Sequence, residues 1–377
     1  MKVNFKNNLL TAVVCFFLIA CNEGGEDITP SFEKDDVEIS LSFATRTPTD
    51  PGLESYEEYF EEGKSIVLVS QKTTTMHFNF NEESSNCYKY VYYKNETANW
   101  DQEYNFRSEN PMSWTRILQK GPDGNTYTFG ALFYPKGYDT DYETKDEVSV
   151  DQSDRETMLK YDILGGFHTT SEYEDRLKFR LYHLMCKLKV NLYIPPYDKQ
   201  TNNGIDVDDV DASALNFHTD YVIEWEGVTS TEEAPVLKAP HPEIPGKEIK
   251  LYKVGREENF NLENIKDNFK DQKIENDIVT KYTFEMLFPQ QGIGSSGNIL
   301  RFVLKRGDQK YNYLFNTTNQ SGTISFKFES GSVTLLELYL PREDNEIVLL
   351  SGVLHDWDDA RAGLTVVETE SSEITGN

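Results

Sequence analysis

The amino-acid sequence predicts an all-β protein built from two antiparallel β-sandwich domains with a few short helices. The first observation is a series of short segments in which apolar and polar residues alternate, the pattern of strands with one buried face. The second is that turn-forming residues such as Pro122, Asp123 and Gly124 separate these segments, while few segments have a helical period. The third is the length of 377 residues, which at ~150 residues per domain is enough for two cores.

The first 20 residues have the pattern of an export signal. Lys2 and Lys6 supply positive charge, and the apolar run that ends at Ala20 is shorter than the ~20 residues needed to span a bilayer. The run ends in Leu18-Ile19-Ala20-Cys21, which resembles the lipobox of bacterial lipoproteins. This resemblance implies cleavage between Ala20 and Cys21 and acyl chains on Cys21, which would hold the protein on a membrane. The alternative is an ordinary secretory signal with a cysteine at this place by chance.

The chain is strongly acidic. Its 64 Asp and Glu residues against 37 Lys and Arg residues give a formal net charge of −27, and loss of Lys2 and Lys6 with the signal makes the remainder more acidic still. Such a charge repels nucleic acid and anionic lipid surfaces, so neither is an expected partner.

A polar tether and then one strand are predicted after the signal. Residues 21–36 have the composition of a flexible linker. Residues 37–43 alternate between apolar and polar side chains, and the apolar ones are Val37, Ile39, Leu41 and Phe43. A short helix is predicted next, with Pro51 at its first position and Gly63 after its end.

Five further strands are predicted before the domain boundary, at residues 65–70, 76–80, 87–93, 113–118 and 127–134. The boundary is placed in the acidic, glycine-containing stretch 165–175, which divides the chain into an N-terminal sandwich (37–170) and a C-terminal sandwich with an acidic tail (171–377). The segment 177–194 then has a period of two whose phase shifts by one residue between Leu181 and Tyr182. Such a shift indicates a bulge or bend where a strand changes its partner.

The second half repeats the strand pattern. Strands are predicted at residues 215–225, 248–254, 280–288, 298–305, 311–315, 324–328, 333–340 and 347–357. One or two helical turns are predicted around Leu262, Ile265 and Phe269.

No catalytic cluster, metal motif or cofactor motif emerges from the sequence, so we expect a protein that is not an enzyme and needs no cofactor. The six histidines are scattered without metal-ligand spacing, at His77, His168, His183, His218, His241 and His355. The glycines at 292, 294 and 297 have the spacing of a dinucleotide-binding loop, but a strand pattern follows where that loop needs a helix. A hairpin loop is therefore the preferred interpretation.

Three other features have a functional and an ordinary interpretation. The acidic run from Asp206 to Asp211 could bind calcium, although it lacks EF-hand spacing and is more simply a solvated acidic loop. The tyrosines at 88, 90, 92 and 93 could stack on sugars or line a sheet. Cys87 and Cys186 could pair, but two buried thiols are favoured over a disulfide.

Several short motifs, taken in order, resemble the fimbrillin-like lipoproteins that build type V pili of Bacteroidales. After the lipobox these are Ala44-Thr45-Arg46, the run 50–56, the aromatic strand 129–135, Asp162-Ile163-Leu164, the run 183–190 and Asp356-Trp357. The resemblance implies transthyretin-like sandwiches, a lipid-anchored and surface-exposed location on the cell outer membrane, and a place in a fimbrium. It also implies assembly with other fimbrial subunits by donor-strand exchange.

In that family an arginine-specific protease removes the first strand, and a strand of the next subunit fills the groove. The matching residue here is Arg46, so the resemblance marks the strand containing Val37, Ile39, Leu41 and Phe43 as exchangeable. Removing it would leave backbone groups and apolar sites for another chain to satisfy. The alternative is that Arg46 stays uncut, as would suit an anchor or accessory subunit.

The donor segment is expected at the C-terminus, where Leu364, Val366 and Val367 could fill a groove. The run is short and its end is acidic, which leaves stalk, tip and anchor positions open.

The expected function is thus that of a fimbrial subunit or fimbria-associated surface lipoprotein that mediates adhesion to host or bacterial surface ligands. One alternative is a surface glycan-binding lipoprotein of a polysaccharide uptake system, suggested by the aromatic content. A surface hydrolase that uses Asp and Glu residues is the third possibility.

Overall fold

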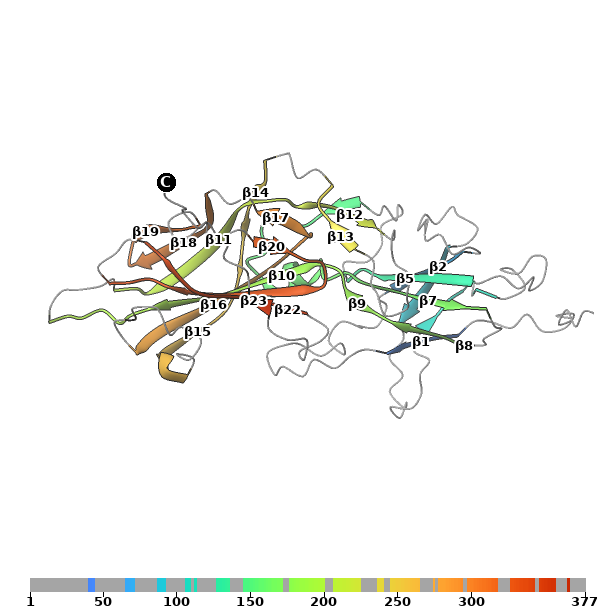
Figure 1. The fold of residues 1–377 in the computed structure, drawn as a ribbon, viewed down its shortest axis with the longest axis horizontal. Coiled ribbons are helices and arrows are strands. Elements are labelled where there is room, and N and C mark those ends of the chain that lie inside the picture. Colours follow the sequence, from blue (N-terminus) through green and yellow to red (C-terminus); the bar gives the residue numbers. More distant parts are fainter. Residues whose placement is uncertain are drawn as a thin grey trace, which may run out of the picture.

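The computed structural model describes residues 40–44, 65–71, 87–92, 106–109, 112–113, 127–135, 145–171, 176–200, 206–224, 236–240, 245–264, 274, 277–293, 297–317, 326–342, 346–356 and 365–366. Within these residues the chain is nearly all strand, as the sequence predicts, and the sheets are mostly antiparallel. Figure 1 shows an elongated molecule whose early strands lie at one end and whose later strands occupy the middle and the other end.

The N-terminal lobe has two layers. One is a six-stranded sheet, in the order β4 (Phe106–Arg107), β3 (Cys87–Tyr92), β2 (Ser65–Gln71), β5 (Tyr127–Phe133), β7 (Leu164–Thr170) and β9 (Tyr182–His183). The other is a two-stranded parallel sheet of β1 (Ser40–Ala44) and β8 (Arg176–Arg180). Buried residues of both layers form one core, which includes Ile66, Phe129, Leu177 and Phe179.

The C-terminal lobe is a larger sandwich. Its six-stranded sheet runs β15 (Tyr252–Asn261), β16 (Ile278–Phe288), β10 (Cys186–Ile194), β21 (Ser332–Tyr339), β22 (Val348–Asp356) and β23 (Thr365–Val366). Its four-stranded sheet runs β14 (Lys247–Lys250), β11 (Asp209–Phe217), β18 (Asn298–Arg306) and β19 (Gln309–Asn316). The alternation along β10 and β18 buries Leu188, Val190, Phe302 and Leu304 between these sheets.

The remaining elements are smaller. They are the sheet of β13 (Val236–Lys238), β12 (Asp220–Glu224) and β6 (Lys145–Glu147), the pair β17 (Gln291–Ile293) and β20 (Phe326–Phe328), the helix α3 (Arg155–Leu159) and the 3₁₀ turn η2 (Leu262–Asn264). The side chain of Asp154 caps α3 by accepting a hydrogen bond from the Thr157 N–H. No helix that the structure describes is long and apolar enough to cross a membrane.

The phase shift predicted between Leu181 and Tyr182 coincides with a change of partner. The predicted segment 177–194 is three strands: β8 pairs with β1, β9 pairs with β7, and β10 pairs with β16 and β21. The chain thus passes from the N-terminal sheets to the centre of the C-terminal sandwich within this segment.

The sheets do not divide at residue 170. Strands β8 and β9 follow that position but pair with N-terminal strands, while β6 precedes it and pairs with β12. Most of the stretch taken as a boundary is the strand β7, whose side chains are largely buried. The division into 37–170 and 171–377 stays a prediction. The pairings of β8 and β9 extend the N-terminal sheets to His183, and the pairing of β6 joins residues 145–147 to the C-terminal half.

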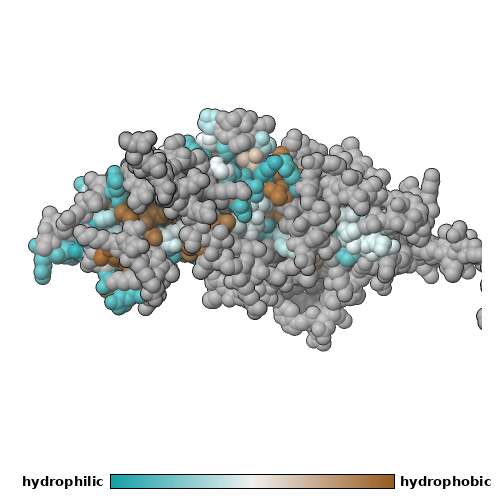
Figure 2. Space-filling view, in the orientation of Figure 1, coloured by the Kyte–Doolittle hydropathy of each residue, from teal (hydrophilic) through white to brown (hydrophobic). Residues whose placement is uncertain are grey.

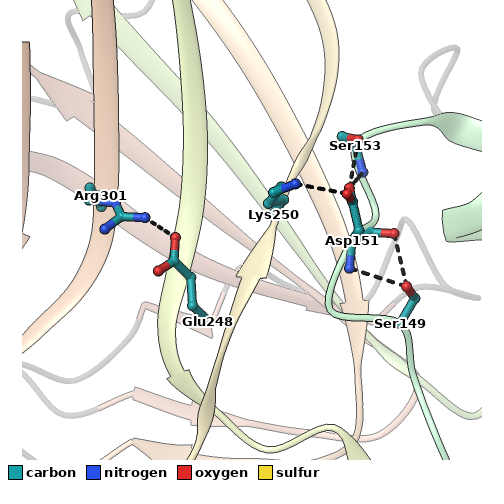
Figure 3. A network of polar contacts seen from close by, with 6 residues as sticks. All are labelled: Ser149, Asp151, Ser153, Glu248, Lys250 and Arg301. Atoms are coloured by element: carbon teal, nitrogen blue, oxygen red, sulfur yellow. Dashed lines mark hydrogen bonds and ion pairs between the residues drawn. The ribbon is translucent and has the colours of Figure 1, made fainter. Parts of the chain in front are cut away.

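The edge of the four-stranded sheet at β14 is covered by the loop that holds Ser149, Asp151 and Ser153 (Figure 3). The Lys250 N–H donates to the Val150 carbonyl (2.9 Å), and the Lys250 carbonyl accepts from the Gln152 N–H (3.1 Å). The ammonium group of Lys250 donates to Asp151 Oδ2 at 2.8 Å. The loop thereby satisfies backbone groups that an open edge would offer to another chain.

Several predicted features have a different form or lie outside the described residues. The glycine-rich segment that begins at Gly292 is not a hairpin, because β17 pairs with β20 whereas β18 pairs with β11 and β19. The predicted acidic loop at 206–211 is partly the strand β11, which begins at Asp209. The helix predicted at residues 51–63, the strand at 76–80, most of the strand at 113–118 and the residues Ile265 and Phe269 are outside the described residues.

Candidate strand-exchange site

The two-stranded sheet of β1 and β8 contains the part of the predicted exchangeable strand that the structure describes. Its parallel register aligns Leu41 with Leu177 and Phe43 with Phe179. The described strand begins at Ser40 and includes Ala44, so Leu41 and Phe43 lie in it, while Val37 and Ile39 lie outside the described residues. Ala20, Cys21 and Arg46 also lie outside them.

Among the strands that the structure describes, β8 is hydrogen-bonded to β1 alone. Leu177, Phe179 and Leu181 of the β8 segment are at most 1% exposed and belong to the core of the N-terminal lobe. Without β1, no described strand would pair with β8, and the edge of β8 that β1 now covers would have its backbone N–H and C=O groups unpaired along five residues. Another extended segment could pair with that edge and restore the ladder.

The predicted donor segment lies in another sheet. Val366 of β23 pairs with Val353 of β22, and Thr365 pairs with Leu354, at the edge of the six-stranded sheet. Leu364 and Val367 lie outside the described residues. The structure therefore does not bring the predicted donor and the exchangeable strand together within one chain, and β23 pairs with its own subunit.

Three acidic side chains of the run 206–211 form ion pairs with basic side chains. Asp209 pairs with Lys253, Lys305 Nζ lies 2.5 Å from Asp211 Oδ2, and Arg306 lies 3.7 Å from Asp206. Partial burial acts to raise the pKa of the Asp209 carboxyl, but hydrogen bonds from Lys253 and the Val210 backbone, with the charges of Lys253 and Lys305, outweigh burial and lower that pKa. Among the described residues no group of three or more His, Cys, Asp or Glu side chains could hold a metal ion.

The predicted alternatives for the tyrosines and cysteines are resolved where the structure describes them. Tyr88 and Tyr90 are 6% and 3% exposed and line the N-terminal core, where the Tyr90 hydroxyl accepts from the Met112 N–H. Cys186 is a free, buried thiol that donates to the Glu329 carbonyl, and burial raises its pKa well above the ordinary value. It therefore forms no disulfide with Cys87.

Sequence reasoning missed the partner of the exchangeable strand and a pocket at the other end of the molecule. The alternation at Leu177, Phe179 and Leu181 was a signal for a strand, but alternation does not indicate which strand it pairs with. The pocket, about 250 Å³ in volume, is formed by residues from β10, β15, β16 and the segment before β11, among them Arg256 and Tyr282. Residues so distant in sequence leave no local motif.

A model of the fimbrillin-like family matches residues 45–357 of the chain. None of the curated proteins compared with the chain matches it. Among solved structures, a candidate cell adhesion protein from Bacteroides uniformis is 13% identical with a TM-score of 0.48, the match covering 85% of this chain and 100% of the other. A second candidate cell adhesion protein, from Bacteroides ovatus, is 12% identical with a TM-score of 0.48 and coverages of 86% and 98%. A fimbrial protein from Bacteroides vulgatus is 13% identical with a TM-score of 0.43 and coverages of 85% and 99%. Because the family model spans most of the chain, the protein belongs to the fimbrillin-like family.

Proposed function

We propose that this protein is a non-enzymatic fimbrial subunit, or a fimbria-associated surface lipoprotein, that assembles by β-strand exchange and mediates adhesion. The observation that carries the proposal is the parallel pairing of β1 with β8, directly before Arg46 in the chain. Family membership supports a role in a fimbrium at the cell surface.

The proposed anchor is lipid on Cys21, which would hold the subunit on the outer membrane. The anchor and β1 both precede Arg46, so one cut after Arg46 would separate both from the rest of the chain. Release from the membrane and exposure of the β8 edge would then be one event. An uncut chain would keep its anchor and its first strand.

The proposed donor is the C-terminal segment with Leu364, Val366 and Val367. In its own subunit β23 makes a ladder of only two residues with β22. Such a short ladder is weak, since each backbone hydrogen bond contributes ~0.5–1.5 kcal/mol net. The segment could therefore leave its own subunit and pair with the β8 edge of another.

The experiment treats membranes that carry the full chain with an arginine-specific protease. The expected result is a soluble product that starts at Thr47 and forms oligomers in gel filtration. Arg46→Lys should abolish release by the arginine-specific enzyme but permit release by trypsin, which isolates the role of the side chain. Release without oligomers would contradict strand exchange, and resistance of the wild-type chain to the protease would contradict processing at Arg46.

A further inference from the structure

The pocket noted above lies at the open end of the C-terminal sandwich. Ile194, which ends β10, and Thr280 and Tyr282 of β16 contribute from one sheet, and Asp206 and Val207 contribute from the segment that enters β11 of the other. Strands β15 and β16 lie far from β1 and β8 (Figure 1). On the face drawn in Figure 2, apolar and hydrophilic residues are interleaved over this half of the molecule.

A β-bulge shapes one wall of the pocket. The register of β15 against β16 shifts between Glu257 and Phe260, and Asn259 within the bulge has φ of 57°, an uncommon value for a residue other than glycine. Glu258 and Asn259 both line the pocket. Bulges of this kind redirect side chains and are frequent beside binding sites.

A buried hydroxyl group lines the same pocket without a hydrogen bond. Tyr282 is 1% exposed, and its hydroxyl oxygen has no hydrogen-bond partner. A buried polar group without a partner destabilises the protein, and a ligand hydroxyl could satisfy it. The Arg256 guanidinium carbon lies 5.6 Å from the centre of the Tyr282 ring, at the same wall.

The charges at the pocket are already balanced. Arg256 pairs with Glu258 at 3.0 Å and donates to the Asp208 carbonyl, and Arg306 lies 3.7 Å from Asp206 and over the ring of Tyr197. The pocket thus offers hydrogen-bond donors and acceptors together without a net charge, which suits a neutral ligand. Hydroxyl groups, which donate and accept, match this set.

The pocket also has apolar walls. Pro195, Val279 and the exposed side chain of Ile278 provide carbon surface beside the tyrosine rings. A volume of about 250 Å³ is slightly below the ~300–1,000 Å³ of pockets for drug-sized ligands. A single sugar ring has apolar C–H faces surrounded by hydroxyl groups. Its size also matches the volume of this pocket.

We propose that this pocket binds a single ring of a neutral glycan, with Tyr282, Glu258 and Arg256 as its hydrogen-bonding groups. The inference rests on the adhesive role proposed above and assigns it a site. The site lies at the end of the molecule away from the strand-exchange edge, so both can be used at once.

The test measures binding of the methyl glycosides of glucose, galactose, mannose and N-acetylglucosamine to the chain from residue 22, by saturation-transfer NMR and titration. At least one glycoside should bind in the millimolar range. Tyr282→Phe, which removes only the unpartnered hydroxyl, and Glu258→Gln should each weaken binding at least tenfold. Glu257→Gln, one position away and outside the pocket lining, should leave the affinity within twofold.

Each outcome decides the proposal. Lack of binding by all four glycosides, or binding that Tyr282→Phe and Glu258→Gln leave unchanged, would overturn it. Binding of acetate or methylguanidine in place of the glycosides would also overturn it, since it would show a charged ligand. Unfolding curves identify a variant that has lost its fold. If Glu258→Gln does not fold, the result for Tyr282→Phe decides whether the proposal stands, because that substitution removes no packed carbon atom. Assembly after cleavage at Arg46 should be the same in Tyr282→Phe as in wild type, so failure of the pocket is distinct from failure of strand exchange.

Discussion

At the scale of single residues, Gln152 joins the two sheets of the C-terminal sandwich. Its side chain is fully buried and makes two hydrogen bonds with the backbone of Leu287 in β16, donating to the carbonyl at 2.8 Å and accepting from the N–H at 2.9 Å. Its own N–H donates to Lys250 of β14 in the opposite sheet. One residue therefore satisfies backbone groups in both sheets.

Gln152→Ala should lower the free energy of unfolding by ~2–4 kcal/mol, because the buried N–H and C=O groups of Leu287 would each lose a partner. Urea denaturation followed by circular dichroism measures this. Ser153→Ala, at the next position but exposed, should cost less than ~1 kcal/mol. A Gln152→Ala variant as stable as the Ser153→Ala variant would contradict the role of Gln152.

Glu337 is a largely buried carboxylate on β21. Its oxygens accept hydrogen bonds from the Tyr193 hydroxyl at 2.7 Å and the Asn191 amide at 3.1 Å, and Thr283 donates to Asn191. Burial raises the pKa of the Glu337 carboxyl above its ordinary value, and this effect outweighs the hydrogen bonds that lower it. The folded state therefore binds this proton more tightly than the unfolded state does.

Stability should consequently fall as pH rises from about 4.5 through the raised pKa of Glu337. Glu337→Gln should remove this slope and should be at least as stable as wild type at pH 7, since its amide oxygen can accept from Asn191 while its NH2 group donates to the Tyr193 hydroxyl oxygen. The measurement is the free energy of unfolding between pH 4.5 and 8. A variant with the wild-type slope, or one less stable at pH 7 by more than ~1 kcal/mol, would show that the ionised carboxylate is favourable here.

At the scale of elements, strands with clear alternation are where the sequence predicts them, with ends that differ by at most two residues, as β2, β5, β16 and β18 show. Strand β7 was missed because Gly165 and Gly166 interrupt its apolar pattern, although both lie buried in the sheet. The start of β11 was missed because Asp209 and Asp211 suggest a loop, whereas lysines of neighbouring strands neutralise them on the outer face.

Pairing between strands could not be predicted in the same way. Nothing in the alternation at residues 40–44 identifies β8 as their partner or makes the pairing parallel. The choice of partner strand and its direction depend on packing throughout the core. The pocket beside Tyr282 likewise depends on residues that are far apart in the sequence.

The C-terminal element β23 should contribute little to folding and much to assembly. A chain that ends at Trp357 should lose at most about 2 kcal/mol of stability, because β23 pairs through only two residues. After cleavage at Arg46 it should accept a donor but provide none, so that it stops the growth of oligomers formed by the full chain. Mixing the two cleaved proteins and measuring oligomer length tests this.

The control for that experiment is a chain that ends at Glu370, which retains Leu364, Val366 and Val367 but lacks the polar end, residues 371–377. It should assemble as the full chain does. Equal assembly by the chain that ends at Trp357 would contradict the assignment of the donor.

At the scale of the whole molecule, the proposed assembly edge and the proposed ligand pocket lie in different lobes. The β1 and β8 pair lies at one end, and β15 and β16, which form part of the pocket, lie toward the other (Figure 1). The N-terminal core and the larger C-terminal core are built from different sets of side chains. Exchange of β1 would therefore change the N-terminal lobe and leave the C-terminal sandwich intact.

The most direct test of the account is a disulfide that locks β1 to β8. Ser42 and Lys178 are register partners, so Ser42→Cys with Lys178→Cys should form a bond that keeps β1 in place after cleavage at Arg46. The measurement is oligomer formation by the cleaved double variant, oxidised and then reduced, with the Ser42→Cys single variant as control. We predict no oligomers while the bond is intact and wild-type assembly after reduction, whereas equal assembly in both states would contradict strand exchange at β8.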